Sequence, residues 1–148
     1  MQRTHGAAVN GSRFSTLLQS GSRSGNFEPF IEYLKSLSPA KADLEIRSLD
    51  PRVREGRCEL ADFVMALTWQ LKSKRDFELV NAWMAVFLRL HADIVGGGAE
   101  MTEGEYEGLQ ALHDALMDWR IEQQREGRRL AELVGYCRGV VSFLRSAR

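Results

Sequence analysis

Apolar residues recur at intervals of three and four along most of this 148-residue chain, and no stretch alternates with a period of two. Intervals of three and four place side chains on one face of an α-helix, whereas half-buried strands alternate. The pattern therefore predicts an all-α fold. We expect a bundle of about six to seven helices, in which antiparallel helical hairpins surround a central helix at about residues 76–95.

The most apolar segment spans residues 74–91 and reads KRDFELVNAWMAVFLRLH. At 100° per residue, its apolar side chains cover an arc of roughly 200°. A helix with such a wide apolar face has to be enclosed by neighbouring elements. For this reason the segment is the expected centre of the bundle.

Capping residues and helix breakers set the other boundaries. Ser38 followed by Pro39 is a strong helix start, because Ser caps a helix and Pro suits its first position. This helix is predicted to end at about Leu49, before a loop over residues 51–57. Further helices are expected over about 12–20, 27–37, 58–73, 103–119 and 125–145, with a kink or break near Gly127. Residues 1–11 are a predicted disordered lead-in, and residues 12–148 are expected to form a single all-helical domain.

Some apolar side chains lie outside the main core stripes. Met65 and Trp69 lie nearly opposite the main stripe of the helix at 58–73, and Tyr136 and Phe143 lie beside the stripe of the last helix. Trp, Tyr, Phe and Met are enriched in the cores of protein interfaces. These four residues are therefore candidates for a partner interface. The stripe of the last helix itself consists of Leu130, Leu133, Val134, Cys137, Val140, Val141 and Leu144.

The charges balance overall but are unevenly distributed. Lys and Arg number 20, as do Asp and Glu, and a zero net charge argues against a dedicated nucleic-acid binder. Residues 93–118 hold seven acidic residues and no Lys or Arg, whereas residues 119–148 hold seven Arg and three Glu. An RNA-binding helical domain that uses the Arg-rich C-terminal helix is the alternative interpretation. The Glu residues between the arginines weaken it.

Motifs for chemistry are missing from the sequence. The three histidines are isolated and form no HExxH or Cys/His cluster, and Cys58 and Cys137 form no CxxC pair. Both cysteines lie among apolar residues, as core thiols do. We therefore expect no enzyme activity, no metal and no cofactor. No apolar run reaches the roughly 18–20 residues of a membrane span, and the N-terminus has no signal-peptide pattern, so no membrane partner is expected.

Two segments together resemble a known family. Residues 34–49 (LKSLSPAKADLEIRSL) and 74–91 look like the C-terminal helical domain of nucleolar WD-repeat proteins numbered twenty-one among the proteins associated with U3 snoRNA. These proteins are subunits of the UTP-B complex in the small-subunit processome. The family-motif residues are Ser38, Pro39, Asp43, Glu45, Arg47, Arg75, Asp76 and Phe77. Family members carry propeller domains before this domain, and none is present here, so the chain resembles an excised C-terminal domain.

The resemblance implies a non-catalytic protein–protein interaction domain of a ribosome-biogenesis scaffold that supports pre-rRNA processing and small-subunit assembly. It also implies a location in the nucleus and nucleolus. The implied partners are the helical C-terminal domains of other UTP-B WD-repeat subunits, with pre-rRNA or snoRNA contacted through the assembly. The surplus apolar surface also admits a homodimer when the domain is isolated.

The charged motif residues have a structural interpretation as well. Glu45, Arg47, Arg75 and Asp76 lie at the edges of apolar helices. We expect some of them to form ion pairs between the helix containing residues 43–49 and the turn before residue 77. Removing one partner of a buried pair costs about 3–5 kcal/mol, whereas an exposed pair contributes about 0–1 kcal/mol. The substitution Arg47→Ala would distinguish the two cases.

Overall fold

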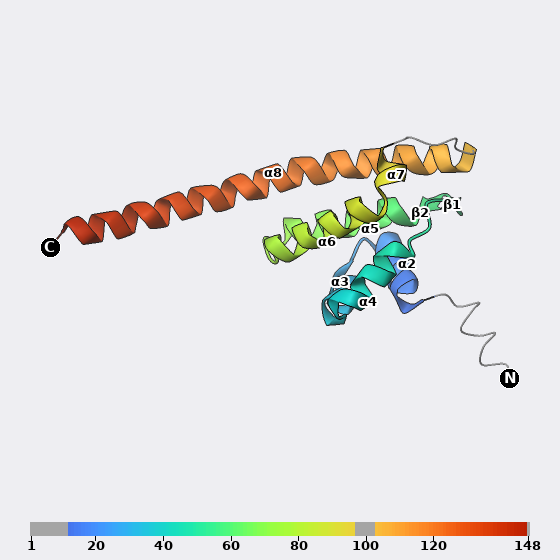
Figure 1. Ribbon diagram of the computed structural model, residues 1–148, viewed down its shortest axis with the longest axis horizontal. Coiled ribbons are helices and arrows are strands. Elements are labelled where there is room, and N and C mark those ends of the chain that lie inside the picture. The colour runs from blue at the N-terminus through green and yellow to red at the C-terminus, as the bar shows by residue number, and fades with distance from the viewer. Residues whose placement is uncertain (1–11, 97–102, 148) are drawn as a thin grey trace.

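The computed structural model describes residues 12–96 and 103–147, so the predicted lead-in at residues 1–11 lies outside the described part. Helices α2, α3 and α4 come first, then a hairpin of strands β1 and β2, and then helices α5 to α8 (Figure 1). Their bounds are α2 Arg13–Ser24, α3 Glu28–Ser36, α4 Pro39–Arg47, β1 Val53–Arg54, β2 Arg57–Cys58, α5 Glu59–Lys72, α6 Phe77–Leu90, α7 Ala92–Val95 and α8 Glu103–Ser146. The expected all-α class is confirmed.

Helix α5 is the centre of the bundle. It packs against α8, α2, α6 and α3, and ten of its 14 residues are buried. Three of the buried residues are polar, and each has a hydrogen-bond partner. Asp62 accepts from Ser22 (2.9 Å), Thr68 donates to the Val64 carbonyl (3.0 Å) and Gln70 donates to Asp76 (2.8 Å). Because these groups are satisfied, their burial is tolerated.

The prediction that residues 76–95 form the central helix is wrong in two respects. The segment divides into α6 and the short α7, and α6 buries only Val80, Trp83, Met84 and Phe87. Leu79 and Leu88 of the same helix are exposed. The wide apolar arc of this segment therefore includes surface positions, and the bundle is centred one helix earlier.

Aromatic rings from four helices meet around α5. Phe63 lies 6.1 Å from Phe14 of α2, 6.1 Å from Phe30 of α3 and 5.5 Å from Phe87 of α6, measured between ring centroids. All four rings are fully buried. Aromatic pairs at this spacing add about 0.5–1.5 kcal/mol beyond area burial. Phe63 is therefore the residue that joins α2, α3 and α6 to the central helix.

The start of α4 follows its capping signal. Ser38 accepts a hydrogen bond from the Lys41 amide (3.3 Å) and Pro39 opens α4, as predicted. Helix α2, in contrast, continues to Ser24 instead of ending near residue 20. Gly21 lies so close to the Phe27 ring that an added Cβ would stand 2.6 Å from Cδ1. Since only glycine permits this approach, Gly21 is a packing residue and not a helix end.

The predicted loop at residues 51–57 contains a short antiparallel hairpin. Val53 lies opposite Cys58 and Arg54 opposite Arg57. Glu55 and Gly56 form the turn with φ of 54° and 73°, the positive values at both positions that a type I′ hairpin turn requires. The expectation of no strand is therefore wrong here. Strands of two residues are too short for a period of two to appear in the sequence.

Helix α8 is one continuous helix of 44 residues, so the predicted break near Gly127 is absent. The ion pair from Glu126 to Arg129 (2.5 Å) spans this glycine, and the pair from Glu122 to Arg125 (2.7 Å) lies in the turn before it. Gly127 itself faces Phe77, whose Cζ would lie 3.8 Å from an added Cβ. These contacts hold the helix together across the glycine. At a rise of 1.5 Å per residue, α8 is about 66 Å long.

Candidate functional site

The second half of α8 extends beyond the bundle (Figure 1). All residues from 131 to 147 are exposed, and we name residues 130–147 the α8 overhang. Its exposed side chains are nevertheless largely apolar, with exposed fractions from 39% at Val140 to 72% at Tyr136. The large exposed apolar residues are Leu133, Val134, Tyr136, Val140, Val141, Phe143 and Leu144. Contiguous apolar surface of this kind is typical of interaction sites.

The apolar side of the overhang continues the buried side of α8. At 100° per residue, the overhang's apolar side chains span an arc of about 180°. Leu112, Ala115 and Trp119, which are buried in the bundle, point in the same direction. The bundle covers α8 only as far as the turn between α5 and α6, where Phe77 lies next to Gly127. The overhang is therefore a core-like face without cover from the described part of the chain.

The four candidate interface residues lie on two surfaces. Tyr136 and Phe143 are 72% and 71% exposed on the overhang, at one edge of its apolar face. Met65 is 46% exposed on α5. Trp69 is half-buried because its ring packs edge-on against Phe27, with centroids 6.4 Å apart. Their role in binding a partner stays a prediction.

Sequence reasoning did not identify the larger part of this surface. Leu133, Val134, Val140, Val141 and Leu144 form a stripe that looks like a core stripe, yet all five are exposed. Cys137, expected as a core thiol, is also exposed, whereas Cys58 is buried as expected. Burial raises the pKa of the Cys58 thiol. An apolar stripe predicts that something covers it but does not tell whether the cover lies in the same chain.

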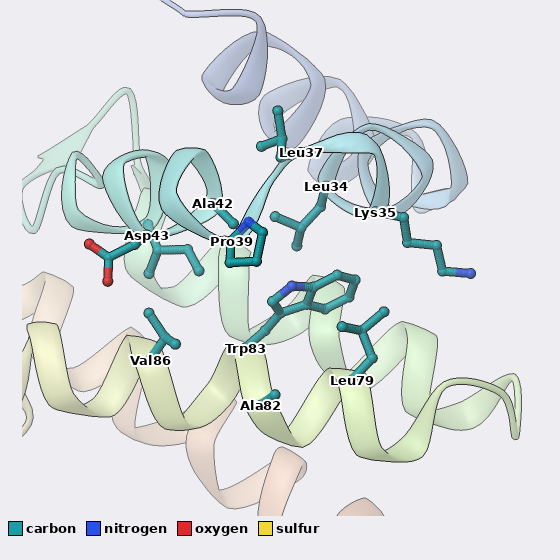
Figure 2. A pocket seen from close by; sticks show the side chains of 11 residues that line it. Leu34, Lys35, Leu37, Pro39, Ala42, Asp43, Leu79, Ala82, Trp83 and Val86 are labelled. Carbon is teal, nitrogen blue, oxygen red and sulfur yellow. The ribbon is translucent and has the colours of Figure 1, made fainter.

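The two segments that carry the family resemblance form the walls of one apolar groove. It has a volume of about 250 Å³ and lies between α4 and α6, beside the end of α3. Figure 2 shows the Trp83 ring rising from α6 toward Pro39 and Leu34. The charged residues that line the groove are Lys35 and Asp43. Each is already in an ion pair, so the groove has no free acid or base for chemistry.

The ion pairs predicted between the helix containing residues 43–49 and the turn before residue 77 are not formed. Asp76 pairs with Lys35 of α3, at 2.5 Å between Oδ2 and Nζ. Arg47 pairs with Asp43 one turn earlier in its own helix (3.0 Å). Asp43 also pairs with Arg89 of α6 (3.4 Å), so Lys35–Asp76 and Asp43–Arg89 are the two ion pairs that join residues 34–49 to residues 74–91. Of the remaining motif residues, Glu45 and Phe77 are half-buried and Arg75 is exposed.

We expect Arg47→Ala to lower the free energy of unfolding by about 1 kcal/mol or less. The Arg47 side chain is 63% exposed and its pair with Asp43 is a surface pair within one helix. Urea titration followed by circular dichroism would measure the change. A loss above about 2 kcal/mol would contradict the exposed geometry.

Asp76 is expected to make the stability depend on pH. Hydrogen bonds from Lys35 and then from Gln70 lower the pKa of the Asp76 carboxyl below its usual value. A lowered folded-state pKa means that stability is present above the unfolded pKa of about 3.9 and is lost as pH falls through the folded pKa. Asp76→Asn should therefore destabilise the protein at pH 6 and have a smaller effect at about pH 3.

The Asn variant suits this test because Asn, like Asp, tolerates the positive φ of 61° at this position. Denaturant titrations of both proteins at the two pH values would measure the difference. An equal destabilisation at pH 6 and pH 3 would show that the Asp76 carboxylate charge is not the cause.

Within residues 12–96 and 103–147, no group of three or more His, Cys, Asp and Glu side chains is placed to hold a metal ion. In the same part of the chain, no helix is both long enough and apolar enough to cross a bilayer. The apolar surfaces that stand out in the described residues are the α8 overhang and the groove between α4 and α6. Both are apolar and suit the binding of helices or apolar side chains.

Comparison with known proteins identifies related sequences. A family described as "Utp21 specific WD40 associated putative domain" matches residues 1–145. The U3 small nucleolar RNA-associated protein 21 homolog of Schizosaccharomyces pombe is 41% identical over 140 residues, which is 93% of this chain and 14% of that protein. U3 small nucleolar RNA-associated protein 21 of Saccharomyces cerevisiae is 34% identical over 136 residues, or 92% of this chain and 13% of that protein. The human WD repeat-containing protein 36 is 31% identical over 86 residues, or 58% of this chain and 10% of that protein.

Proposed function

This chain belongs to the Utp21-specific WD40-associated domain family, and from that premise we propose that it is a protein–protein interaction domain of a ribosome-biogenesis scaffold. Its role is non-catalytic, in the UTP-B complex of the small-subunit processome, where it supports pre-rRNA processing and small-subunit assembly. The names of the two yeast relatives, which associate them with U3 small nucleolar RNA, support this assignment and a nucleolar location in the nucleus.

The observation that carries the proposal is the α8 overhang. It exposes seven large apolar side chains on a helix whose other half is packed as core. Burying one such side chain contributes about 1.5–3 kcal/mol. Association costs an estimated 4–15 kcal/mol in lost freedom of motion. Covering several of these side chains is therefore enough to hold a partner.

We propose the helical C-terminal domains of other UTP-B WD-repeat subunits as the partners, with pre-rRNA or snoRNA reached through the assembly. Light scattering on the chain, alone and mixed with each of these domains, tests the idea. The expected result is a defined heteromeric complex with at least one of them. If the chain binds none of these domains, the proposal is wrong. If the chain forms a dimer on its own, the partner is a second copy of the chain instead.

A matched pair of variants tests whether the overhang is the surface that binds the partner. Leu133→Asp places a charge in the apolar face, whereas Ser146→Asp places the same charge on the far side of the same helix, outside the groove lined by Arg138 and Arg145. We expect the first to abolish the complex and the second to leave it intact. Neither position is covered in the free chain, so both variants should fold.

The comparisons also support assigning residues 12–148 to one helical domain of a longer WD-repeat protein. The chain spans only 14% and 13% of the length of the two yeast relatives. A single cooperative unfolding transition, seen alike by circular dichroism and tryptophan fluorescence, is the expected result for one domain. Two separate transitions would contradict it.

RNA binding through the Arg-rich C-terminal helix is the second candidate function. Arg128, Arg138 and Arg145 are exposed, which favours it. Arg125 and Arg129 are already paired with glutamates of the same helix, which weakens it. Binding of structured RNA with a steep salt dependence would support this function over protein docking.

A further inference from the structure

The overhang is apolar on four of the seven positions of a heptad. With Leu130 at position a, the apolar residues occupy a (Leu130, Cys137, Leu144), d (Leu133, Val140), e (Val134, Val141) and g (Tyr136, Phe143). A two-stranded coiled coil needs apolar residues only at a and d, and its e and g positions are usually charged. The apolar face of the overhang is therefore wider than the seam for a single partner helix.

A face of this width has a centre and two edges. Val134 and Val141 form one edge, which we name the valine edge, and Tyr136 and Phe143 form the other, the aromatic edge. A single helix seated over the centre would leave at least one edge in water. Helices in three- and four-helix bundles contact neighbours on both sides. We propose that a partner covers the overhang with two helices, a helical hairpin with one helix against each edge.

This inference rests on the proposed function and adds the chemistry of the partner. Arg138 and Arg145 line a shallow groove along the valine edge, together with Val134 and Val141. No acidic residue lines this groove. Neither arginine forms an ion pair with another residue of the described chain. The helix on the valine edge therefore carries Asp or Glu that face the two arginines.

The aromatic edge calls for a different helix. Glu132 lies next to this edge on the helical wheel, and Arg129, the basic residue nearest to it, is already bound by Glu126. Two large rings, both more than 70% exposed, dominate the surface there. Rings of this kind are anchors that fill apolar pockets. The second helix of the hairpin is therefore apolar where it meets Tyr136 and Phe143.

By charge complementarity, a second copy of this chain is a poor partner for the overhang. The overhang, residues 130–147, carries Arg138 and Arg145 against Glu132. In a parallel pair of overhangs each arginine would lie beside its own copy, and like charges facing one another across an interface are unfavourable. Charge complementarity thus favours an acidic partner over self-association.

Synthetic probes added to the full chain test the inference. The first is an acidic hairpin of two helices, each about as long as the overhang, with Leu at a and d and Glu at the flanking positions. The second is one of these helices alone, and the third is the same hairpin with Lys in place of Glu. Calorimetry should give the acidic hairpin an affinity at least tenfold above either other probe, on the order of 1.4 kcal/mol. The affinity should weaken as salt rises.

Charge reversal provides the matched control. Arg138→Glu with Arg145→Glu should lower affinity for the acidic hairpin at least tenfold, on the order of 1.4 kcal/mol. Arg120→Glu should leave affinity unchanged, because Arg120 points the same way as Arg138 but lies about five turns earlier, beside the bundle. Equal binding of the single helix would overturn the two-helix geometry. Equal binding of the Lys hairpin would overturn the acidic chemistry.

The native assembly provides a second readout. A photo-crosslinking residue placed in turn at Val141 and at Phe143 should mark two different helices of the partner. Adducts on one and the same helix would overturn the proposal, as would a dimer of this chain that excludes the acidic hairpin. If the native domains bind while both probe tests fail, the hairpin is wrong and the proposed function stands. If the probes bind but no native domain does, the proposed function fails instead.

Discussion

A chain carrying both Tyr136→Ser and Phe143→Ser is expected to lose at least about 100-fold of its affinity for its helical partner. Both rings are more than 70% exposed in the free chain, so a partner is what would bury them. Truncating a buried aromatic anchor typically costs 2 kcal/mol or more in binding. The free energy of unfolding should change by less than about 0.5 kcal/mol, because surface substitutions rarely change it more.

Calorimetry or surface plasmon resonance would measure the loss of affinity, and thermal denaturation would confirm the unchanged stability. Met117→Ser with Ile121→Ser is the matched control, since these two residues of α8 are 56% and 53% exposed but lie outside the overhang. The control should bind like the unmodified chain. If both double variants bind equally well, the overhang does not provide the anchors.

Phe63→Ala is expected to lower the free energy of unfolding by about 3–5 kcal/mol. Phe63 is fully buried and contacts rings from α2, α3 and α6, so its removal leaves a cavity at the point where these helices meet α5. Native domains are stable by only about 5–15 kcal/mol. The variant should therefore have a strongly lowered melting temperature, measured by circular dichroism or calorimetry.

Met65→Ala is the control for Phe63→Ala, because it removes a large apolar side chain from the same helix two residues later. Met65 is 46% exposed, so its removal leaves no enclosed cavity, and the change should stay within about 1 kcal/mol. Comparable losses for the two variants would show that α5 is not packed as the ring contacts indicate.

Helix starts were predictable because their signals are local. Ser38 and Pro39 fix the beginning of α4 through one hydrogen bond and one dihedral angle, and both effects can be read from adjacent residues. The hairpin at residues 53–58 was not predictable in the same way. Its turn depends on positive φ at Glu55, a residue type that rarely adopts this conformation, so only Gly56 gave a hint.

The centre of the bundle was misplaced because apolar content does not measure burial. Residues 77–90 are richer in large apolar side chains, yet Leu79 and Leu88 face solvent. Residues 59–72 include Asp62, Thr68 and Gln70, which look like surface residues but are buried with hydrogen-bond partners. Those partners come from Ser22, Val64 and Asp76, and two of the three lie outside the helix. A one-dimensional pattern cannot indicate such contacts.

The candidate site was predictable only in part for a related reason. Tyr136 and Phe143 were identified because they fall beside the stripe of their helix, whereas the stripe itself was expected to be core. Its spacing is the same whether the cover comes from this chain or from another. Helix α8 continues across Gly127, where Phe77, far away in sequence, packs against it and the Glu126–Arg129 ion pair spans the glycine.

The division of α8 into a packed half and a bare half has a consequence for its dynamics. A helix of 12–15 residues without tertiary contacts is only marginally populated in water, and each glycine lowers its stability by about 1 kcal/mol relative to alanine. Gly135 and Gly139 both lie in the bare half. Amide hydrogen exchange should therefore be slow near Trp119 and fast near Val140, along one and the same helix.

Binding of a partner would then be coupled to helix formation in the second half of α8. The free energy that is needed to order this helix would reduce the free energy of binding. A wide apolar face can in this way form a complex that still dissociates readily.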